Sequence, residues 1–487
     1  MLTVLLILFP MLAALVLFFG KASNARSLAL GFSVVEFALA LVAFLQYKSN
    51  PNAAMLNFDA VWVAALGIHF SVSINALSLL MVLLSTFLVP LIILSSFKNE
   101  YAKGYNFYGL LLFMQMALVG VFTANDGFLF YVFWELALIP IYFICLLWGG
   151  ENRNFITFKF FVYTLLGSLF MLVGLIYLYN HSGGFTGVKS WAVQDLYNAG
   201  RSLTEAQQSA VFWLIFIAFA IKMPVFPFHT WQPDTYVTAP TQGTMMLSGI
   251  MLKMGTFGLI KWLLPIVPLG LAKWGGTAIT LSVIGIIYAS IIAISQKDFK
   301  RLIAYSSIAH VGLIAAGILS ANQQGIQGAI MQMLSHGVNV VGLFLIADIL
   351  LRHTGTREIA DLGGIRNMNG NFAVLFLIVL LGSVALPLTN GFVGEFLLIN
   401  GVYQYGATMA AFAGLTVILG AVYMLRAYQN IMLGERKTGG LEFGRLASSD
   451  KAVLVIICVV VIAFGVYPKP LNDIAEEGTK AILNLMK

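Results

Sequence analysis

Apolar segments long enough to cross a membrane recur along almost the whole chain, and this repetition restricts the fold more than any other feature. A membrane-spanning helix needs roughly 17–25 mostly apolar residues to cross about 30 Å of hydrocarbon. Segments of this kind lie near residues 2–20, 27–47, 76–97, 106–124, 127–148, 157–179, 209–227, 241–264, 275–295, 301–319, 326–351, 371–402, 407–432 and 452–468. The sequence therefore predicts an all-α, polytopic membrane protein with about fourteen transmembrane helices.

The composition agrees with a protein whose surroundings are mostly lipid. Hydrophobic residues make up 60% of the 487 residues and charged residues 10%, and the mean hydropathy is +0.91, whereas a soluble domain carries about 25% charged residues. The net charge of +7 comes from Lys and Arg scattered singly through short loops, which argues against nucleic-acid binding. Cys145 and Cys458 lie inside apolar runs, so neither a disulfide framework nor a metal site is indicated.

The basic residues also predict how the chain is oriented. Loops after odd-numbered helices hold about seventeen Lys and Arg and the remaining loops about eight, and the richer set belongs on the cytoplasmic side. Both termini are therefore expected outside. The first apolar segment has no preceding basic residue and no small-residue cleavage site, so we interpret it as a retained helix rather than a signal peptide. The longest expected loops are 48–75, 180–208 and 433–450.

Ionisable side chains fall inside several predicted spans, where such groups are costly and usually functional. The candidate proton-translocating residues are Glu135, Lys222, Lys253, His310, His336 and Glu395. Simpler interpretations stay open: Lys222 could extend to the interface, Glu135 and Lys253 could form a structural ion pair, either histidine could be a hydrogen-bonded core residue, and Glu395 could cap a broken helix. Lys261 and Arg426 lie near helix ends, and we expect both to extend to the interface.

Prolines predict a break beside two of these charges. Pro224 and Pro227 follow Lys222, and each removes an intrahelical hydrogen bond and crowds the preceding turn. Pro387, with nearby glycines, precedes Glu395 in "VALPLTNGFVGEF". Unwound backbone is tolerated at membrane depth only where protein or a water-filled cavity satisfies it. Two broken helices that each carry a mid-membrane charge indicate a hydrated ion pathway.

The spacing of the charges predicts an internal repeat. Glu135 precedes Lys222 by 87 residues, and His310 precedes Glu395 by 85. Two successive units with an odd number of helices must be inverted relative to each other, and inverted repeats with broken helices are typical of translocators. The expected units are 1–105 (helices 1–3), 106–268 (first repeat, helices 4–8), 269–433 (second repeat, helices 9–13) and 434–487 (C-terminal loop and helix 14).

Electrostatic magnitudes indicate what such a series can do. At an effective dielectric near 20 and a separation of roughly 4–6 Å, Glu135 and Lys222 would interact by about 3–4 kcal/mol. Moving one charge through 100 mV requires about 2.3 kcal/mol. Making and breaking one such pair could therefore drive a proton uphill. We hypothesise that Lys222 holds a proton while paired with Glu135 and passes it through water towards Lys253, the two histidines and Glu395.

Four long motifs resemble one family. The segments "AFAIKMPVFPFHTWQPDTYVTAPTQGTMMLSGIMLKMGTFGLI", "KDFKRLIAYSSIAHVG", "FYVFWELALIPIYF" and "LPLTNGFVGEFLLI" are similar to the antiporter-like, proton-pumping membrane chains of NADH-quinone oxidoreductase, respiratory complex I. The resemblance extends over roughly residues 70–430. It implies that Glu135 is the modulating glutamate, Lys222 the pump lysine, Lys253 the central lysine and Glu395 the terminal exchange group. His310 and His336 would then lie on the axis that connects them.

The resemblance also implies partners and a location. It places this chain among other complex I membrane subunits, especially the antiporter-like subunits L and N, in the bacterial inner membrane with both termini periplasmic. NADH, FMN, iron–sulfur clusters and quinone would be bound by partner subunits, and this chain by itself would carry no cofactor or metal. A subunit of a multisubunit cation/proton antiporter would share most of these motifs and stays the alternative. An organic-solute transporter would not share them.

Overall fold

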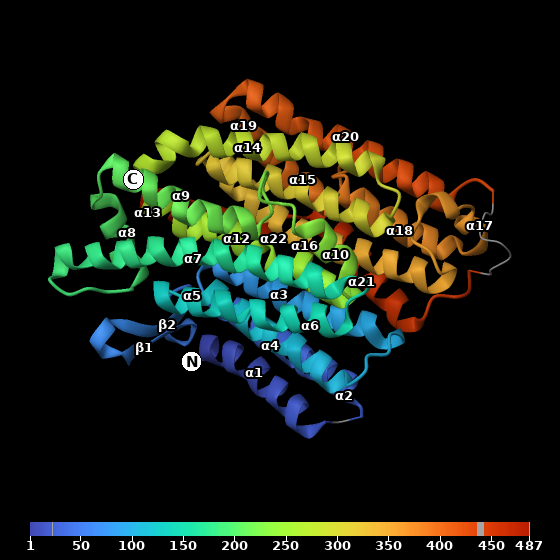
Figure 1. Cartoon of the computed structure of the whole chain (residues 1–487), viewed down its shortest axis with the longest axis horizontal. Helices are drawn as coiled ribbons and strands as arrows, with labels where there is room; N and C mark the ends of the chain where they lie inside the picture. Colours follow the sequence, from blue (N-terminus) through green and yellow to red (C-terminus); the bar gives the residue numbers. More distant parts are fainter. Residues whose placement is uncertain (22, 436–442, 487) are drawn as a thin grey trace.

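The computed structural model describes residues 1–21, 23–435 and 443–486, and it consists almost wholly of helices (Figure 1). Twelve helical segments within these residues are long and apolar enough to cross a membrane. The predicted all-α, multi-pass fold is confirmed, whereas the division into inverted five-helix units stays a prediction. Part of the loop expected over 433–450 lies outside the described residues.

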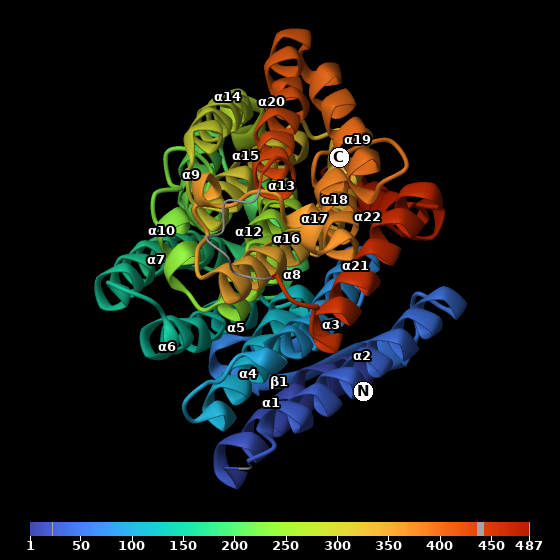
Figure 2. The same cartoon turned by 90° about the vertical axis from the view of Figure 1, so that its right-hand side faces the viewer.

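The N-terminal part combines three membrane helices with a β-hairpin. Its elements are α1 (Leu2–Gly20), α2 (Ala25–Ser49), β1 (Asn57–Val63), β2 (Ile68–Ser73) and α3 (Ala76–Ser95). The two strands pair antiparallel, with Asn57 opposite Ser73 and an irregularity between Val61 and Val63. The segment 48–75, which we expected to be a loop, therefore contains regular structure. In Figure 2, α1 and α2 run side by side along one edge of the molecule.

The next stretch forms the helices of the expected first repeat. They are α4 (Gly104–Thr123), α5 (Gly127–Leu136), α6 (Leu138–Trp148), α7 (Arg153–Thr186), α8 (Val193–Ser202), α9 (Glu205–Lys222), α10 (Gln232–Thr238), α11 (Thr241–Met246), α12 (Lys253–Gly258) and α13 (Leu264–Ile266). Two π-helical turns, Leu247–Met251 and Leu259–Leu263, flank α12. The predicted helix over 241–264 is thus wound more widely on both sides of Lys253, a distortion frequent at functional sites.

The remaining elements complete the second expected repeat and the C-terminal part. They are α14 (Pro268–Ser295), α15 (Phe299–Leu319), α16 (Gln323–Thr354), α17 (Ile365–Met368), α18 (Gly370–Ser383), α19 (Asn390–Tyr405), α20 (Ala407–Met432), α21 (Ser448–Val466) and α22 (Lys469–Met486). The long helix α16 is buried along most of its length and packs against α15, α19 and α21. The sequence did not predict α22, which lies against α3 and α16.

Both helix breaks occur where the prolines predict them. Helix α9 ends at Lys222, and the next helix, α10, begins only at Gln232. The Trp231 indole Nε1 donates to the Ile221 carbonyl at 2.9 Å, so the chain after the break folds back onto the end of α9. Helix α18 ends at Ser383 and α19 starts at Asn390. The span expected over 371–402 is therefore two helices.

A buried ion cluster fastens α16 to α21 near one membrane end. The Arg352 guanidinium contacts Asp348, one turn earlier in α16, and Asp450 in the first turn of α21, each at 2.9 Å. Asp348 also accepts from the Thr241 hydroxyl at 2.6 Å, at the start of α11. Because Asp450 is fully buried, this charge is held by its ion pair and not by water. The cluster fixes the elements that surround the candidate site.

Candidate functional site

Lys253 and His336 form the first direct contact of the site. The Lys253 Nζ lies 2.6 Å from the Ser248 carbonyl oxygen, to which it donates, and 2.8 Å from the His336 Nδ1. Both side chains are buried. An ammonium can only donate, so His336 accepts at Nδ1 and carries its own proton at Nε2. That nitrogen lies 3.1 Å from the Ser307 hydroxyl. The geometry thus fits an ammonium next to a neutral imidazole.

His310 and Glu395 form the second contact, between α15 and α19. The His310 Nε2 lies 3.3 Å from the Glu395 Oε1, and the Gln332 amide donates to the same oxygen at 3.2 Å. The His310 Nε2 also faces the Ser383 carbonyl at 3.1 Å, while Nδ1 faces the Ser306 carbonyl at 2.8 Å. Carbonyl oxygens only accept hydrogen bonds. A ring protonated on both nitrogens satisfies all these contacts, so the geometry fits an imidazolium–carboxylate pair.

The second helix break supplies part of this site. The Ser383 carbonyl that faces His310 is at the end of α18, and the Asn390 carbonyl at the start of α19 accepts from the Ser335 hydroxyl at 2.8 Å. Interrupting the helix therefore exposes backbone oxygens to polar side chains at membrane depth, as the sequence predicts. Because α19 starts anew after this break, Glu395 in its second turn lies next to His310.

Hydroxyl groups and a small cavity connect the two contacts. The His310 and His336 ring centroids lie 5.8 Å apart. A polar cavity of about 10 Å³ lies between them, lined by Ser306, Ser307, His310, Gln332, His336, Asn339 and Ser383 among others. This volume is close to the minimum for one water molecule. The Tyr423 hydroxyl donates to the Ser306 hydroxyl at 3.0 Å. Four of the candidate residues, Lys253, His336, His310 and Glu395, therefore belong to one buried polar network.

Glu135 and Lys222 lie apart from this network. Lys222 is buried, and its Nζ lies 5.3 Å from the Trp134 ring centroid, in a cation–π contact. No direct ion pair joins Glu135 to Lys222 within the described chain. One Glu135 carboxyl oxygen, Oε1, is buried without a hydrogen-bond partner. In this conformation the two side chains therefore form no direct ion pair, and their coupling stays a prediction.

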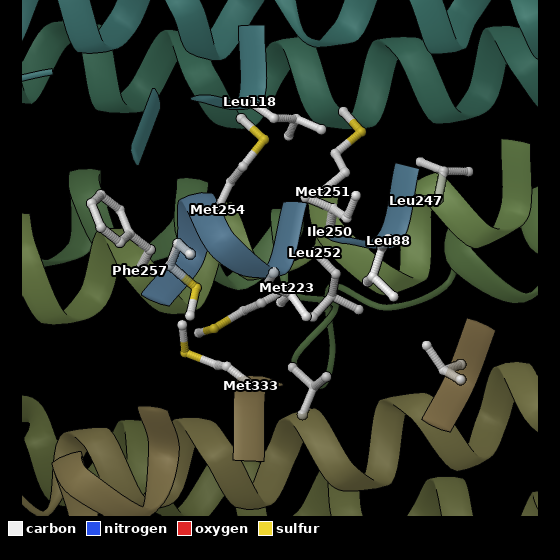
Figure 3. Close-up of a cluster of buried hydrophobic side chains, with 14 of the residues drawn as sticks. Leu88, Leu118, Met223, Leu247, Ile250, Met251, Leu252, Met254, Phe257 and Met333 are labelled. Carbon is white, nitrogen blue, oxygen red and sulfur yellow. The ribbon is translucent and has the colours of Figure 1, made fainter. Parts of the chain in front are cut away.

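Apolar side chains line the space beside Lys222. The void beside Lys222 is lined by Leu247, Met251 and Leu252 and has no volume for a water molecule. Figure 3 shows the surrounding cluster, in which the Met223 and Met333 side chains reach towards each other. Met223 follows Lys222, and Met333 lies one turn before His336. In this conformation the space beside Lys222 therefore has no room for water.

Two buried lysines were misjudged from the sequence. Lys261, which we expected to extend to the interface, is buried, and its Nζ donates to the Ala124 carbonyl at 2.7 Å and to Asn125 at 2.9 Å. Lys300, which falls between the expected spans 275–295 and 301–319, is also buried and donates to the Ala239 carbonyl at 2.8 Å. Both lysines lie near helix ends, which favoured an exposed position. They are buried because neighbouring elements cover these helix ends. Arg426 is exposed, and its extension to the interface stays a prediction.

Gly394 brings α19 close enough to α16 for Glu395 to reach the network. A Cβ at this position would lie 2.8 Å from the Gln332 Cα. We expect Gly394→Val to push the helices apart, which should cost roughly 1–3 kcal/mol of stability and weaken the Glu395 contacts. Thermal unfolding of the purified protein and proton uptake by vesicles would measure both effects. The control is Gly414→Ala in α20, where nothing lies within 4 Å; equal losses in both variants would contradict this explanation.

Comparisons with known proteins place these features in one group. Residues 124–420 match the family model described as NADH:quinone oxidoreductase/Mrp antiporter, transmembrane region. The chain is 38% identical to NADH-quinone oxidoreductase subunit M of Rickettsia typhi, over 93% of this chain and 90% of that protein. It is 35% identical to F(420)H(2) dehydrogenase subunit M of Methanosarcina mazei, over 99% and 98%. A chain of the Thermus thermophilus respiratory complex I with bound NADH superposes with a TM-score of 0.91 at 31% identity, covering both chains fully.

Proposed function

This chain belongs to the NADH:quinone oxidoreductase/Mrp antiporter family, and we propose that it is a proton-translocating membrane subunit of an NADH-quinone oxidoreductase, of the subunit M type. The observation that carries the proposal is the buried polar network of Lys253, His336, His310 and Glu395. Each member can gain or lose a proton, and isolated charges of this kind are expensive at membrane depth. A structural role alone gives no reason to align them.

The network suggests how a proton would move through the second half of the chain. Lys253 would give a proton to the His336 Nδ1, and the His336 Nε2 would release one towards the Ser307 hydroxyl. One water in the adjoining cavity would complete the connection to His310. His310 would first pass its Nε2 proton to Glu395, and the neutral ring would then accept the proton that arrives through the water. Glu395 would release its proton towards the solvent side. Each step from Lys253 to Glu395 joins groups within hydrogen-bond distance or separated by the space of one water.

Glu135 and Lys222 would control access to this route. With the Lys222 Nζ held over the Trp134 ring and no room for water beside it, a proton would not pass from Lys222 to Lys253. Approach or withdrawal of the Glu135 carboxylate would change how firmly Lys222 holds its proton, because an opposite charge favours the charged form. Hydration of the apolar cluster would then open the connection. The modulating role of Glu135 and the pump role of Lys222 agree with this arrangement.

The assembly and its location form part of the same proposal. The chain would lie in the bacterial inner membrane with both termini periplasmic, next to the other membrane subunits of complex I, especially the antiporter-like subunits L and N. NADH, FMN, iron–sulfur clusters and quinone would be bound by those partners, and quinone reduction there would drive translocation here. Within the chain, we propose the units 1–105, 106–268, 269–433 and 434–487, the middle two being inverted repeats.

The decisive test replaces Lys222 with alanine in the assembled complex. We expect Lys222→Ala to abolish NADH-driven proton uptake in vesicles, because the buried ammonium that holds the proton is gone. A pH-sensitive dye would report uptake, and a native gel would report assembly. Lys273→Ala is the matched control, because Lys273 is half-exposed and pairs with Glu205 at the surface. Full proton uptake by an assembled Lys222→Ala complex would refute the proposal.

A subunit of a multisubunit cation/proton antiporter is the second candidate, since the matching family model covers Mrp antiporters as well. The two functions differ in the driving ion. If the chain is part of an antiporter, an imposed sodium gradient should move protons in vesicles without NADH. If it is part of an NADH-quinone oxidoreductase, NADH should drive proton uptake in sodium-free buffer.

A further inference from the structure

A groove at one membrane end of α14 and α20 lies outside the network described above. It has a volume of about 450 Å³, and its lining includes Lys297, just after the end of α14, and Arg426 and Asn430 near the end of α20. A second hollow, of about 520 Å³ on the outer face of α20, shares Arg426 and Asn430 with it. The two hollows together form the α14–α20 groove. The helices α14 and α20 pack against each other and run side by side along one edge of the molecule (Figure 1).

The groove holds two cationic side chains that have no anionic partner in the described part of the chain. Lys297 and Arg426 both line it, and both are exposed. Asp298, which follows Lys297, is already engaged: its carboxylate pairs with Arg357 at 3.1 Å and accepts from the Arg301 backbone N–H at 2.8 Å. An anion in the groove would therefore meet two positive charges that the described chain does not neutralise.

Other charged residues at this end of the molecule lie around the groove and not in it. Glu358 and Asp361 stand on either side of the lining residue Ile359, and both are exposed. Neither of them lines the groove, and no other acidic residue of the described chain does. Arg366 in α17, a helix that packs against α20, is exposed as well. Exposed charges outside the groove are screened by water and salt, so its own basic lining decides what it attracts.

The inner wall of the groove is apolar. Leu302, Ile359 and Ala427 are buried side chains of its lining. Tyr423 also lines it and is 1% exposed, and its hydroxyl is engaged with Ser306 at 3.0 Å. The positive charges are thus at the exposed mouth, while the interior offers hydrocarbon. A ligand that fits both parts has an anionic group and an apolar group.

The position of the groove in the membrane fits a lipid. Arg426 lies about two turns before the end of α20 and Lys297 just beyond the end of α14, so the groove is at the level where the hydrocarbon core meets the headgroups. Exposed large apolar side chains continue from it towards mid-membrane: Ile418 and Val422 on α20 and Ile291 on α14. Val422 also lines the outer hollow. Free phosphate would contact the cations alone, whereas a phospholipid would contact the cations and these apolar faces.

We propose that the α14–α20 groove binds an anionic phospholipid, with its phosphate on Arg426 and Lys297 and its acyl chains along the apolar faces of α14 and α20. A guanidinium offers parallel N–H donors that match phosphate oxygens, and the Asn430 amide can donate as well. Basic pockets between membrane helices bind anionic headgroups in this way. A zwitterionic headgroup would bring its own cation next to two others, which repel it. The site is independent of the function proposed above, because neither cation belongs to the central network.

The test uses the assembled complex and a phosphatidylglycerol that carries a photoreactive group in its acyl chain. After illumination, mass spectrometry should find the label on peptides of α14 and α20, and labelling at increasing lipid concentration gives the affinity. Arg426→Gln combined with Lys297→Gln should weaken binding by about thirtyfold, or about fivefold for each basic residue. Arg426→Lys keeps the charge and should retain most of the binding. The control is Lys98→Gln combined with Lys103→Gln, two exposed lysines between α3 and α4, which should leave it unchanged.

Competing ligands identify what the groove recognises. Unlabelled phosphatidylglycerol should displace the photoreactive lipid, whereas phosphatidylcholine and inorganic phosphate at the same concentration should not. Equal displacement by phosphatidylcholine would show that this face accepts any lipid, and displacement by inorganic phosphate would show a site for the free anion. Absence of label on α14 and α20 would show that a partner subunit covers the groove. Any of these results, or wild-type labelling of the Arg426→Gln and Lys297→Gln double variant, would overturn the proposal.

Discussion

Replacing Lys253 with methionine should reduce proton translocation by about a hundredfold or more while leaving the chain folded. Methionine fills a similar volume without a charge, so packing of α12 is retained. Without the fixed ammonium, a hydrated proton would have to occupy the site, and a charge at mid-membrane costs about 3 kcal/mol or more. Each 1.36 kcal/mol is tenfold in rate, which gives the expected size. His336 would also lose the donor to its Nδ1.

The measurement is NADH-driven proton uptake by vesicles that contain the assembled complex, together with NADH oxidation in the presence of an uncoupler. Lys451→Met is the matched control, because Lys451 is an exposed lysine in α21. Lys253→Arg adds a second comparison: it keeps the charge but cannot release a proton readily, so it should fold normally and still fail to translocate. Proton uptake by Lys253→Met at half the wild-type rate would exclude a role for Lys253 as an obligatory carrier.

The sequence predicts well which ionisable side chains lie inside membrane spans. It predicts poorly which of them contact each other. Apolar runs locate Lys253, His336 and Glu395 inside spans, because an ionisable group stands out against hydrocarbon-facing residues. Proline chemistry locates both helix breaks. Whether two such groups touch depends on how each helix is rotated and which helices pack together. His310 meets Glu395 across 85 residues of chain, while Glu135 and Lys222, at a similar spacing, do not meet.

Other features of the structure were not predicted from the sequence, each for a different reason. The alternation in "NFDAVWV" and "IHFSVS" has the period of a β-strand, but these short segments lie between long helical spans and were therefore predicted to be a loop. The π-helical turns beside Lys253 leave no mark in the apolar pattern, since they widen the winding without changing which residues are buried. Glu36 also carried a signal, a lone carboxylate in an apolar span, and its carboxyl oxygens are buried without a hydrogen-bond partner in the described part of the chain.

Neutralising Glu395 should separate its structural and proton-exchange roles. In Glu395→Gln the side chain keeps its size, so the Gln332 contact can be replaced by an amide–amide hydrogen bond. The imidazolium of His310 would lose its counter-charge, and a buried charge left unpaired costs about 3–5 kcal/mol. His310 should therefore shed its second proton instead. We expect proton translocation to fall by about a hundredfold, the rate equivalent of about 3 kcal/mol, while thermal stability changes little.

Three variants distinguish this explanation from a packing effect. Glu395→Ala removes charge and volume and should lower both stability and translocation, whereas Glu395→Gln should lower translocation alone. Glu395→Asp keeps the charge on a shorter side chain, so it should retain part of the activity. Combining Glu395→Gln with His310→Gln should cost little beyond either change by itself, because the two residues act as one pair. Strictly additive losses would show that His310 and Glu395 work independently.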